Sequence, residues 1–496
     1  MKVFTYPVSY DILTNGVQIP KVSDEIWQYC QMHVNPLRVG HSVSESGQGK
    51  GEDMLSKGEL KSKVCQEIDS RGEEIVGVAK AILAAPETGF REVKTSRLVA
   101  QKFTELGIPY RDGLAVTGVK GVIQGSSQGP TVAVLGELDS LIVPDHPNAD
   151  TKTGAAHACG HHAQIGMLIG VAVALTGSGV LPFLGGRVAL MAVPAEEYIE
   201  IEFRVGLRRK GKVSFLGGKP ELIKLGEFDD IDMAMMTHTG PIAKGRKLAL
   251  GGTSNGTVAK QVQFIGRGAH AGGAPHRGIN ALNAAMIALS AIHTQRETFK
   301  DADTIRVHPI ITKGGEAVNI VPSDVRMETF VRGKTLEAIK EANEKVDRAL
   351  RAGALAVGGS VRITTLPGYL PMMNDRNLQQ VYRLNAISLT GKGRVVPGGR
   401  HGTGSTDMGD VSHIMPAIHP FAGGATGTSH GNDYLIEDYE LAVLTAAKAM
   451  ATTVVDLLAD GAIEGKEVLA RSKPQMTKQE YLTSMEDLLK EELYES

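Results

Sequence analysis

Apolar residues recur every three to four positions between residues 60 and 83, which is the spacing of a helix with one buried face. A second helix is predicted for residues 96–106, after the sequence APETGF has interrupted the first pattern. Short apolar runs bounded by glycine and serine, GVIQG, TVAVLGEL and VALMAV, predict buried strands, and a long apolar helix is predicted to begin near Ala163. The periodic positions of the first stretch are Leu60, Val64, Ile68, Ile75, Val78, Ala79 and Ile82.

Strands that alternate with helices predict an α/β fold class with a largely parallel central sheet. Ligands of such sheets gather at the carboxyl ends of the strands. Two acidic sequences, GELD and PAEE, each follow directly after an apolar run. We therefore expect reactive side chains at that edge of the sheet.

The pattern changes between residues 253 and 366, where strands with alternating apolar and polar positions surround helices at 281–293 and 336–352. The order β-α-β-β-α-β predicts a ferredoxin-like α+β domain inserted into a larger one. The predicted division is an N-terminal extension that is partly loop (1–58), a first part of the larger domain (59–252), the inserted domain (253–366) and a second part of the larger domain (367–496). The second part includes a predicted helix at 439–458.

The net charge and the apolar segments of the sequence limit which classes of partner the chain is expected to bind. Its 496 residues include 53 basic and 55 acidic ones, a formal net charge of -2, without a long basic block that would bind nucleic acid. The sequence predicts no apolar segment of the roughly 18 residues that a membrane span requires, and the N-terminus lacks the apolar stretch of a signal peptide. We expect a small-molecule substrate, no nucleic acid and no membrane.

Cysteine usage bears on the location of the protein. Cys30, Cys65 and Cys159 are widely spaced and odd in number, which argues against a disulfide framework and for a reducing compartment. We therefore expect a cytoplasmic protein in which Cys159 remains available as a thiolate ligand.

Two short sequences carry side chains that bind metal ions. HACGHH places Cys159 and His161 two residues apart, and both types suit a borderline-soft divalent ion. PAEE places Glu196 and Glu197 after a buried strand, where neighbouring side chains point in opposite directions. One carboxylate can then bind a metal while the other moves the proton of a water molecule. The alternatives are a small buried side chain, a capping histidine and a solvated strand end.

Two further histidines follow later in the chain. His238 ends an apolar run in MMTHTGP, and His430 lies in the glycine-rich sequence GGATGTSHGNDY. Taken alone, each is more often a packed or surface residue. All four segments share one form, however, an apolar strand or loop that ends in a ligand-type side chain. Their five candidate ligands suit two metal ions.

Six motifs in this order resemble those of the M20 metallopeptidase family, in its amidohydrolase branch of aminoacylase-like, hippurate-hydrolase-like and p-aminobenzoyl-glutamate-hydrolase-like enzymes. The motifs are HACGH, PAEE, HTGP, GRGAHAGGAPHRGINAL, EAVNIVP and STDMGDVSHIMPAIHPFAGG. The resemblance extends from the region of Leu60 to that of Leu458. It implies that the larger domain is a di-metal catalytic domain and that the inserted domain is a lid and dimerisation domain.

The resemblance also implies roles for single residues. Glu196 would be the general acid/base, and Asp139 in GELD would orient a metal-binding imidazole. His270 would reach the active site of a partner subunit and stabilise the oxyanion, while Asn319 and Arg332 would contact substrate. For His270 and Arg332 the alternatives are a turn residue and an exposed strand residue. The implied ligands of the two ions are Cys159 as a bridge, His161, Glu197, His238 and His430.

The chain departs from the family pattern at several places, two of which adjoin the candidate metal ligands. His162 stands where the family usually has aspartate or asparagine, and it could compete as a metal ligand. The connection IEIEFRVGLRRKGKVSFLGGK, residues 199–219, is longer than usual. It could shape the substrate pocket or a subunit contact, but a solvated hairpin is the expected structure. Its basic residues include Arg204, Arg208, Arg209, Lys210 and Lys212.

We therefore predict a metal-dependent amidohydrolase that cleaves N-acyl amino acids or related small amides. Two divalent metal ions, Mn²⁺ or Zn²⁺, are the expected cofactors, and a homodimer formed through the inserted domain is the expected assembly. A dipeptidase or carboxypeptidase of the same family is one alternative. A non-catalytic metal-binding protein is the alternative from another class.

Overall fold

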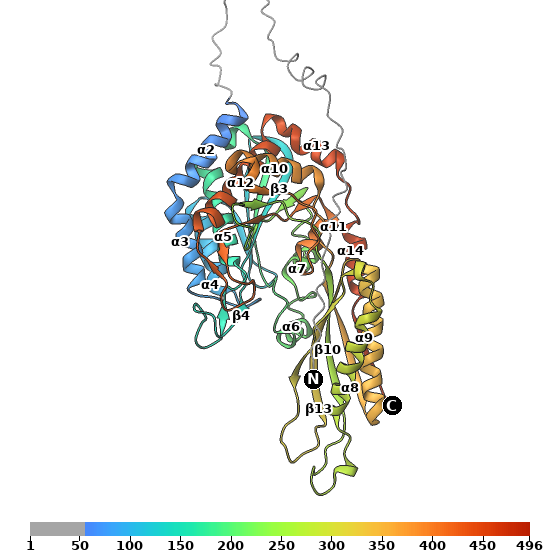
Figure 1. Cartoon of the computed structure of the whole chain (residues 1–496). Helices are drawn as coiled ribbons and strands as arrows, with labels where there is room; N and C mark the ends of the chain where they lie inside the picture. The colour runs from blue at the N-terminus through green and yellow to red at the C-terminus, as the bar shows by residue number, and fades with distance from the viewer. Residues whose placement is uncertain (1–54) are drawn as a thin grey trace, which may run out of the picture. The chain divides into compact units, whose positions relative to one another are not determined.

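The computed structural model describes residues 55–496. The prediction of a partly looped extension at residues 1–58 therefore lies outside the described residues up to residue 54. The described part contains a central sheet with helices on both faces and a second sheet built from the inserted segment (Figure 1). The predicted α/β class with an inserted α+β domain is confirmed.

The central sheet has six strands in the order β1-β2-β6-β3-β7-β16. β3 pairs in parallel with β6 and β7, and β7 pairs in parallel with β16, whereas β1 and β2 form an antiparallel edge. The apolar runs of β3 and β6 are buried because helices cover both faces of the sheet. The strands are β1 (Tyr110–Leu114), β2 (Gly118–Gln124), β3 (Ser127–Glu137), β6 (Gly185–Val193), β7 (Met233–Met235) and β16 (Ala417–Ile418).

Helix α5 (His161–Gly177) lies between β3 and the helices α2, α3 and α12. It is buried on all sides because its sequence is apolar around the whole circumference after its first turn. The first predicted helical stretch consists of two helices, α2 (Lys57–Ser70) and α3 (Gly72–Leu83). The other helices of the larger domain are α4 (Val93–Glu105), α6 (Ile201–Arg209), α7 (Gly218–Lys224), α10 (Arg376–Thr390), α11 (Met408–Ile414), α12 (Ala446–Leu458), α13 (Ile463–Arg471) and α14 (Lys478–Asp487).

One described stretch, Glu440–Leu458, is long and apolar enough to cross a membrane, with a mean hydropathy of 1.6. The expectation that no segment reaches this length was therefore wrong. The stretch begins with a π-helical turn, η6 (Glu440–Thr445), and continues as α12. Within the fold, 72% of its apolar window is buried, against neighbours that include α2, α5 and α10. This burial accounts for its apolar composition.

Short strands around the carboxyl edge of the central sheet hold several loops in place. A four-stranded sheet has the order β15-β9-β17-β8, and its strand β8 carries His238. These pairings fix loops that would otherwise be free to move. The short strands are β4 (Leu141–Ile142), β5 (Ala155–Ala156), β8 (His238–Thr239), β9 (Leu248–Ala249), β15 (Val395–Val396), β17 (Phe421–Ala422), β18 (Ala425–Thr426) and β19 (Leu435–Ile436).

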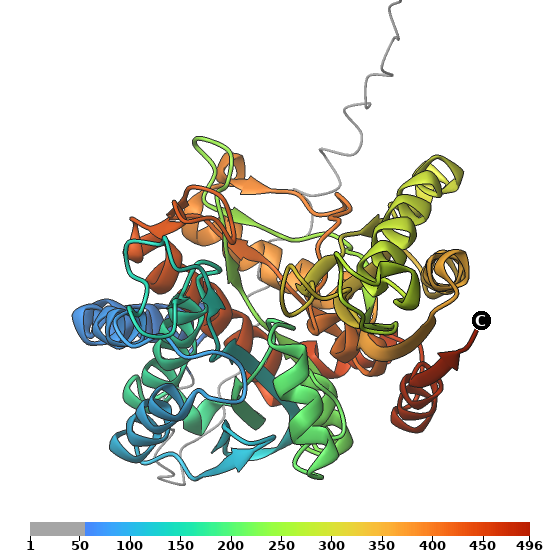
Figure 2. The same ribbon diagram turned by 90° about the horizontal axis from the view of Figure 1, so that it is seen from below.

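The inserted segment forms an antiparallel sheet in which β13 and β14 flank β10, and β11 and β12 pair with β13. Helices α8 and α9 lie side by side on one face (Figures 1 and 2). Every second residue of β13 is buried, as expected for a strand with one covered face. The elements are β10 (Gly256–Ile265), α8 (Ala281–Thr294), β11 (Arg306–Val307), β12 (Ile310–Lys313), β13 (Asp324–Gly333), α9 (Leu336–Val357) and β14 (Ser360–Tyr369).

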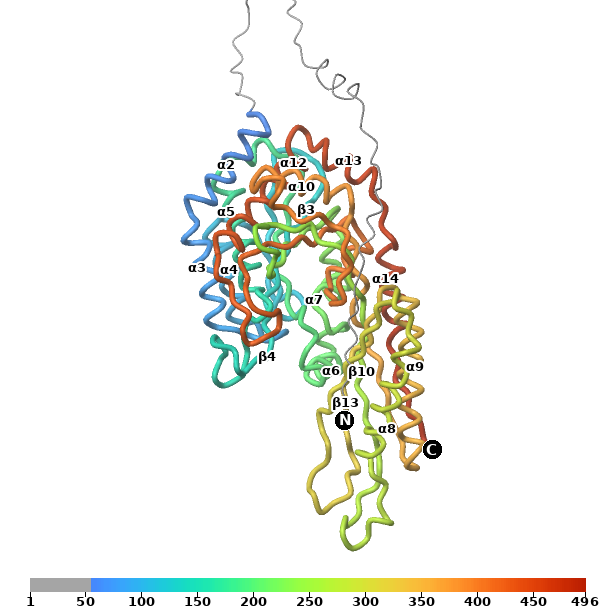
Figure 3. Tube along the Cα trace, in the orientation of Figure 1, coloured from blue at the N-terminus to red at the C-terminus, as the bar shows by residue number. Residues whose placement is uncertain are grey.

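The C-terminal segment returns to the inserted domain, as the trace in Figure 3 shows. Helix α14 packs against α11 of the larger domain, and Tyr481 donates a hydrogen bond to Asp410 Oδ1 at 3.0 Å. The last strand, β20 (Lys490–Tyr494), then pairs antiparallel with β14. The predicted division, which placed all of 367–496 in the larger domain, is wrong for this strand. Its edge pairing is long-range, so no local pattern announces it.

Candidate active site

The turn before α5 orients the residues of HACGHH. Gly160 has a φ of 88°, in the left-handed region that glycine favours, and a Cβ at this position would lie 2.2 Å from Thr239 Oγ1. This turn places Cys159 just before the helix and His161 in its first turn. His238 approaches from β8, and Cys159 Sγ lies 3.4 Å from His238 Nε2.

The structure brings all five predicted ligands together in two groups that share Cys159. One group contains Cys159, His161 and His238, and the other contains Cys159, Glu197 and His430. Within each group the ligand atoms lie within 4.8 Å of one another. A sulfur common to both groups suits two neighbouring ions bridged by one thiolate.

The donor atoms fit divalent cations. His161 Nδ1 lies 2.9 Å from the Asp139 carbonyl oxygen and 3.3 Å from its carboxylate Oδ1, which turns Nε2 toward the cluster. His161 Nε2 and Glu197 Oε1 are buried and make no hydrogen bond of normal geometry, although Glu137 Oε2 lies 3.1 Å from the first atom and His430 Nε2 lies 3.4 Å from the second. Buried polar atoms are normally paired, so unpaired imidazole and carboxylate atoms beside a thiol indicate a metal centre. Imidazole, thiolate and carboxylate together are a donor set for zinc-like ions.

The pKa values of the buried side chains in this cluster depend strongly on one another. Burial and the Glu197 carboxylate raise the pKa of Cys159, but the imidazoles of His238 and His161 outweigh them and bring it to about 6. Burial also raises the pKa of Glu197, yet His430 prevails and lowers it to about 2. The Glu197 carboxylate in turn raises the pKa of His430 to about 11. The thiolate form of Cys159 is thus accessible near neutral pH.

Glu196 lies beside the cluster and differs from its neighbour Glu197. Burial, together with the carboxylates of Glu137 and Glu197, raises the pKa of Glu196 well above its usual range. Its Oε2 lies 4.0 Å from His161 Nε2, and Tyr369 donates a hydrogen bond to its backbone carbonyl at 2.5 Å. Two adjacent carboxylates whose pKa values are driven apart are typical of an acid/base residue next to a metal ligand.

Sequence reasoning missed a buried ionic network behind the cluster. Lys219 Nζ, which is fully buried, lies 2.6 Å from Glu137 Oε1 and also pairs with Asp407. Glu137 Oε2 lies 3.1 Å from His161 Nε2. Glu137 could have been found from the sequence, because it lies two residues before Asp139 and alternate residues of an extended segment face the same side. No pattern pointed to Lys219, because its partners are 82 and 188 residues away.

His162 does not join the ligand groups. Its Nε2 lies 3.2 Å from the Tyr439 hydroxyl, and its ring lies 5.2 Å from that of His157. Burial and the neighbouring His161 lower its pKa to about 3. Among residues 55–496, the groups of possible metal ligands do not include it. His162 is thus a neutral, buried side chain behind the metal centre.

Of the predicted residues of the inserted domain, Arg332 lies nearest this cluster: burial lowers its pKa, and the carboxylates of Glu196 and Glu197 partly oppose that effect. His270 and Asn319 are exposed in loops that meet through the Ala271 N–H and the Asn319 carbonyl, 2.9 Å apart. Arg332 pairs with Thr257 near the start of β10, whereas His270 follows the far end of that strand. A ten-residue strand spans ~30 Å. The structure therefore separates His270 from Arg332 by the length of the inserted sheet within one chain.

A cavity of about 570 Å³ opens onto the cluster. Cys159, Glu196, Glu197, His238 and His430 form part of its wall. The remaining wall comes from three segments, residues 252–254, residues 400–406 and the strand region that carries His419 and Phe421. The buried His419 imidazole, whose Nε2 makes no hydrogen bond, is a cavity residue to which sequence reasoning assigned no role, although it lies within the motif STDMGDVSHIMPAIHPFAGG.

The connection 199–219 is not a solvated hairpin, so that expectation was wrong. It contains helix α6, and Arg204 within it is 0% exposed. Its apolar residues Ile201 and Val205 are buried with Phe90 and Tyr369 in one cluster. Apolar positions four residues apart gave a helical signal that the basic residues obscured.

Comparison with known proteins relates this site to a family. The model of the M20 peptidase dimerisation domain matches residues 250–357. A Xaa-Arg dipeptidase from Mus musculus is 28% identical over 423 residues, which cover 80% of this chain and 89% of the relative. An N-acetyl-L-cysteine deacetylase from Bacillus subtilis is 26% identical over 344 residues, which cover 68% of this chain and 77% of the relative.

Solved structures share the fold. A dinuclear metal-binding peptidase of the M20 family from Bacillus subtilis superposes with a TM-score of 0.56 at 20% identity, covering 79% of this chain and 99% of the other. An aminobenzoyl-glutamate utilization protein from Klebsiella pneumoniae superposes with a TM-score of 0.61 at 18% identity, covering 79% and 98%. The chain therefore contains a segment that matches the M20 peptidase dimerisation domain, is similar in sequence to these hydrolases, and shares its fold with the two solved proteins.

Proposed function

We propose that this protein is a metal-dependent amidohydrolase that cleaves the amide bond of N-acyl amino acids or related small amides. The observation that carries the proposal is the pair of ligand groups that share Cys159, with Glu196 beside them and a cavity in front. Cys159, His161 and His238 would hold one divalent ion, and Cys159, Glu197 and His430 would hold the other. We favour manganese or zinc for both positions.

Bound ions at these positions supply a Lewis acid for the amide carbonyl and lower the pKa of a water molecule. Glu196 accepts the proton of that water and later delivers it to the departing nitrogen. Its raised pKa makes the Glu196 carboxylate a stronger base than an exposed glutamate and makes its protonated form, the proton donor, available near neutral pH. Asp139 keeps the His161 ring in a fixed orientation during this exchange.

His270 is proposed to act in the site of a partner subunit. Its Nδ1 accepts hydrogen bonds from the backbone N–H groups of Gly272 and Gly273 at 3.2 and 3.0 Å. A neutral ring bonded in this way carries its proton on Nε2, ready to donate to an oxyanion. The length of β10 supports a role in trans. The cavity of the same chain lies near the start of this strand, and His270 follows its far end, so the strand separates the two by about 30 Å.

The cavity lining favours an N-acyl amino acid over a dipeptide. Apart from the proposed metal ligands, the described residues that line it carry one carboxylate, Glu196, and one guanidinium, Arg400. Burial lowers the pKa of His401 and brings that of His419 to about 3, so these two rings are neutral near pH 7. A dipeptide brings a free ammonium group that requires an anionic partner, whereas an acylated amine does not. We propose that Asn319 of the partner subunit and Arg332 contact the free carboxylate. Dipeptide hydrolysis remains the second candidate, because two curated relatives are Xaa-Arg dipeptidases.

The test is hydrolysis by protein reconstituted with Mn²⁺ or Zn²⁺, offered N-acetyl and N-benzoyl amino acids, p-aminobenzoyl-glutamate and dipeptides. We expect turnover of at least one N-acyl substrate and slower turnover of dipeptides. Glu196→Gln should keep both ions but lose ~10²–10⁴-fold in kcat, because the proton carrier is gone. Full activity of this variant, or a metal-loaded wild type that hydrolyses none of these amides, would contradict the proposal.

A further inference from the structure

The connection after PAEE contains a buried cation whose role is unexplained by the proposed chemistry. Arg204 on α6 is 0% exposed, and among residues 55–496 no carboxylate lies within ion-pair distance of it. Its guanidinium instead donates hydrogen bonds to the carbonyl oxygens of Ala195 at 3.0 Å, Leu216 at 2.8 Å and Glu197. A buried charge without a counter-ion is costly, and an apolar side chain would fill the space at a lower cost. Such local costs are typical of functional sites.

Two of these carbonyls flank Glu196. Its own carbonyl oxygen accepts a hydrogen bond from the Tyr369 hydroxyl. The backbone N–H of Ala195 donates to Glu92 Oε1 at 2.8 Å, and that of Glu197 donates to Asp139 Oδ2 at 2.9 Å. The backbone of residues 195–197 is thus held on both sides, with Arg204 as the group that joins its two ends.

Ala195 explains why such a hold is needed. It has a φ of 56°, in the left-handed region, which a residue other than glycine keeps only when its surroundings enforce it. Arg204 and Glu92 bind the carbonyl and the N–H of this residue. Relaxation of Ala195 toward a common conformation would turn the following Glu196 side chain away from its present direction.

The neighbours of Arg204 are shaped around its guanidinium. A Cβ at Gly89 would lie 2.1 Å from Arg204 Nη2 and 2.8 Å from Ala195 Cα. The rings of Phe90 and Tyr198 lie 5.3 and 5.9 Å from the guanidinium carbon, within the range of cation–π contacts. The sequence ETGF therefore lies directly against PAEE through Arg204.

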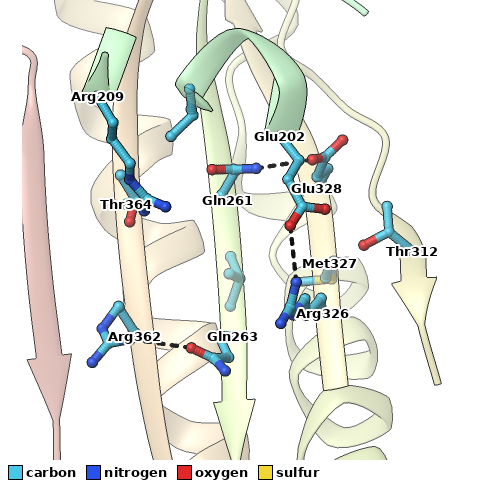
Figure 4. A pocket seen from close by; sticks show the side chains of 12 residues that line it. Glu202, Arg209, Gln261, Gln263, Thr312, Arg326, Met327, Glu328, Arg362 and Thr364 are labelled. Atoms are coloured by element: carbon cyan, nitrogen blue, oxygen red, sulfur yellow. Dashed lines mark hydrogen bonds and ion pairs between the residues drawn. The ribbon is translucent and has the colours of Figure 1, made fainter. Parts of the chain in front are cut away.

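The opposite face of α6 contacts the inserted domain. Glu202 accepts a hydrogen bond from Arg326 on β13 at 3.0 Å (Figure 4). Arg209, from the same helix, is exposed and lines the same pocket as Glu202 and Arg326. Helix α6 therefore contacts the inserted sheet through Glu202 and the acidic pair of the active site through Arg204.

We propose that Arg204 is a positioning residue for amide hydrolysis: it fixes the backbone on both sides of Glu196, so that the Glu196 carboxylate faces the attacking water and the Glu197 carboxylate faces the metal ions. This inference rests on the proposed function, since it assigns Arg204 to the same acid/base and ligand pair. Arg204 itself touches neither substrate nor ions.

The test compares Arg204→Met and Arg204→Lys with the matched control Arg209→Met, which removes an exposed arginine from the same helix. Metal content, affinity for Zn²⁺ by competition with a chelator, kcat and KM are measured per folded, metal-loaded protein. Arg204→Met should lower kcat ~10²-fold with little change in KM, because a displacement of the carboxylate by about 1 Å suffices for such a loss. It should weaken Zn²⁺ affinity ~10–100-fold, as loss of groups behind metal ligands does.

If the methionine variant does not fold, the Arg204→Lys variant alone tests the positioning role of Arg204. A lysine retains the charge but cannot span three carbonyls in one plane, so we expect an intermediate loss of kcat, a smaller loss of Zn²⁺ affinity and unchanged KM. Arg209→Met should match the wild type in all four quantities. The inference would be overturned if both Arg204 variants, or the lysine variant alone when methionine is not tolerated, kept kcat and Zn²⁺ affinity within twofold of the wild type.

Failure of the proposed function is distinguishable from failure of this inference. A wild type that hydrolyses none of the amides contradicts the proposed function, and Zn²⁺ affinity then decides the role of Arg204 by itself. A loss of kcat that is accompanied by an equal rise in KM and by unchanged Zn²⁺ affinity would instead show that Arg204 supports the cavity and not the carboxylates.

Discussion

Single residues at the metal centre derive their properties from neighbours that are distant in sequence. Glu196 and Glu197 are adjacent in the chain, but burial among carboxylates raises the pKa of one while His430 lowers that of the other to about 2. Cys159 is a buried thiol whose pKa falls to about 6 only because two imidazoles face it. The same residue types in an exposed loop would titrate normally.

Metal affinity should depend on pH with a sign that follows from these values. Ion binding displaces the protons of the ligand imidazoles of His161, His238 and His430, whose pKa values are all raised, so affinity should rise with pH while these rings carry protons in the metal-free protein. Below about pH 6 the Cys159 thiol adds a further proton, and affinity should fall by an additional factor of ~10 per pH unit. Zn²⁺ titrations against a chelator between pH 5 and 8 measure both slopes.

Cys65 provides the control for this prediction. It is a free thiol outside the cluster, and burial raises its pKa. Cys65→Ser should leave the pH profile unchanged, whereas Cys159→Ser should weaken binding and remove the steeper part below pH 6. An affinity that does not vary between pH 5 and 8 would be inconsistent with a thiolate ligand at Cys159.

Among the elements, the C-terminal helix and strand join the two parts of the fold. Helix α14 is held on the larger domain by Tyr481, which is buried and bonded to Asp410. Strand β20 covers the edge of β14 in the inserted sheet. An uncovered edge strand is prone to pair with other chains, so β20 protects one edge, while the edge formed by β11 and β12 pairs with no further strand among residues 55–496.

Truncation after Leu489 should remove this protection without touching α14. We expect faster amide hydrogen exchange in residues 360–369 and a lower melting temperature of the inserted domain. A loss of about 1 kcal/mol shifts the melting temperature of a domain of this size by about 4–8 °C. Hydrogen-exchange mass spectrometry and calorimetry measure the two effects. Leu493→Ser, which changes an exposed side chain but keeps the strand, is the control, and unchanged exchange in the truncated protein would refute the protective role.

At the scale of the whole molecule, His270 lies far from the metal cluster of its own chain within the described residues. The match to a dimerisation domain at residues 250–357 suggests a homodimer, and the proposed role of His270 requires such a second copy. Exposed apolar side chains on α8 and β12, including Met286, Ile287, Ile310 and Ile311, offer a surface for that copy. A symmetric pair would then supply His270 to both cavities at once.

Mixing two inactive variants tests this arrangement. His270→Ala and Glu196→Gln should each be nearly inactive as pure proteins. Mixed dimers contain one site with an intact Glu196 and an intact His270 from the partner, so an equal mixture that exchanges subunits should recover roughly a quarter of the wild-type activity. Steady-state rates before and after subunit exchange provide the measurement. No recovery in a mixture shown to form mixed dimers would exclude a role for His270 in trans.

The amino-acid sequence by itself determined the elements and the ligand types. The spacing of apolar residues predicted the α/β class, the inserted domain and most helices, because burial of one helix face or of both strand faces leaves a local imprint. HACGHH, PAEE, His238 and His430 were identifiable because ligand-type side chains at strand ends are visible without knowing the fold.

Only the tertiary structure decided which of these side chains meet and what surrounds them. The burial of Arg204, the pairing of Lys219 with Glu137 and Asp407, and the covering of β14 by β20 join residues that are far apart in the chain. Cys159 became a shared member of two ligand groups only when His238, Glu197 and His430 were folded around it. The physical reason is that pKa values, buried charges and strand edges depend on distances in space, and a linear pattern records only distances along the chain.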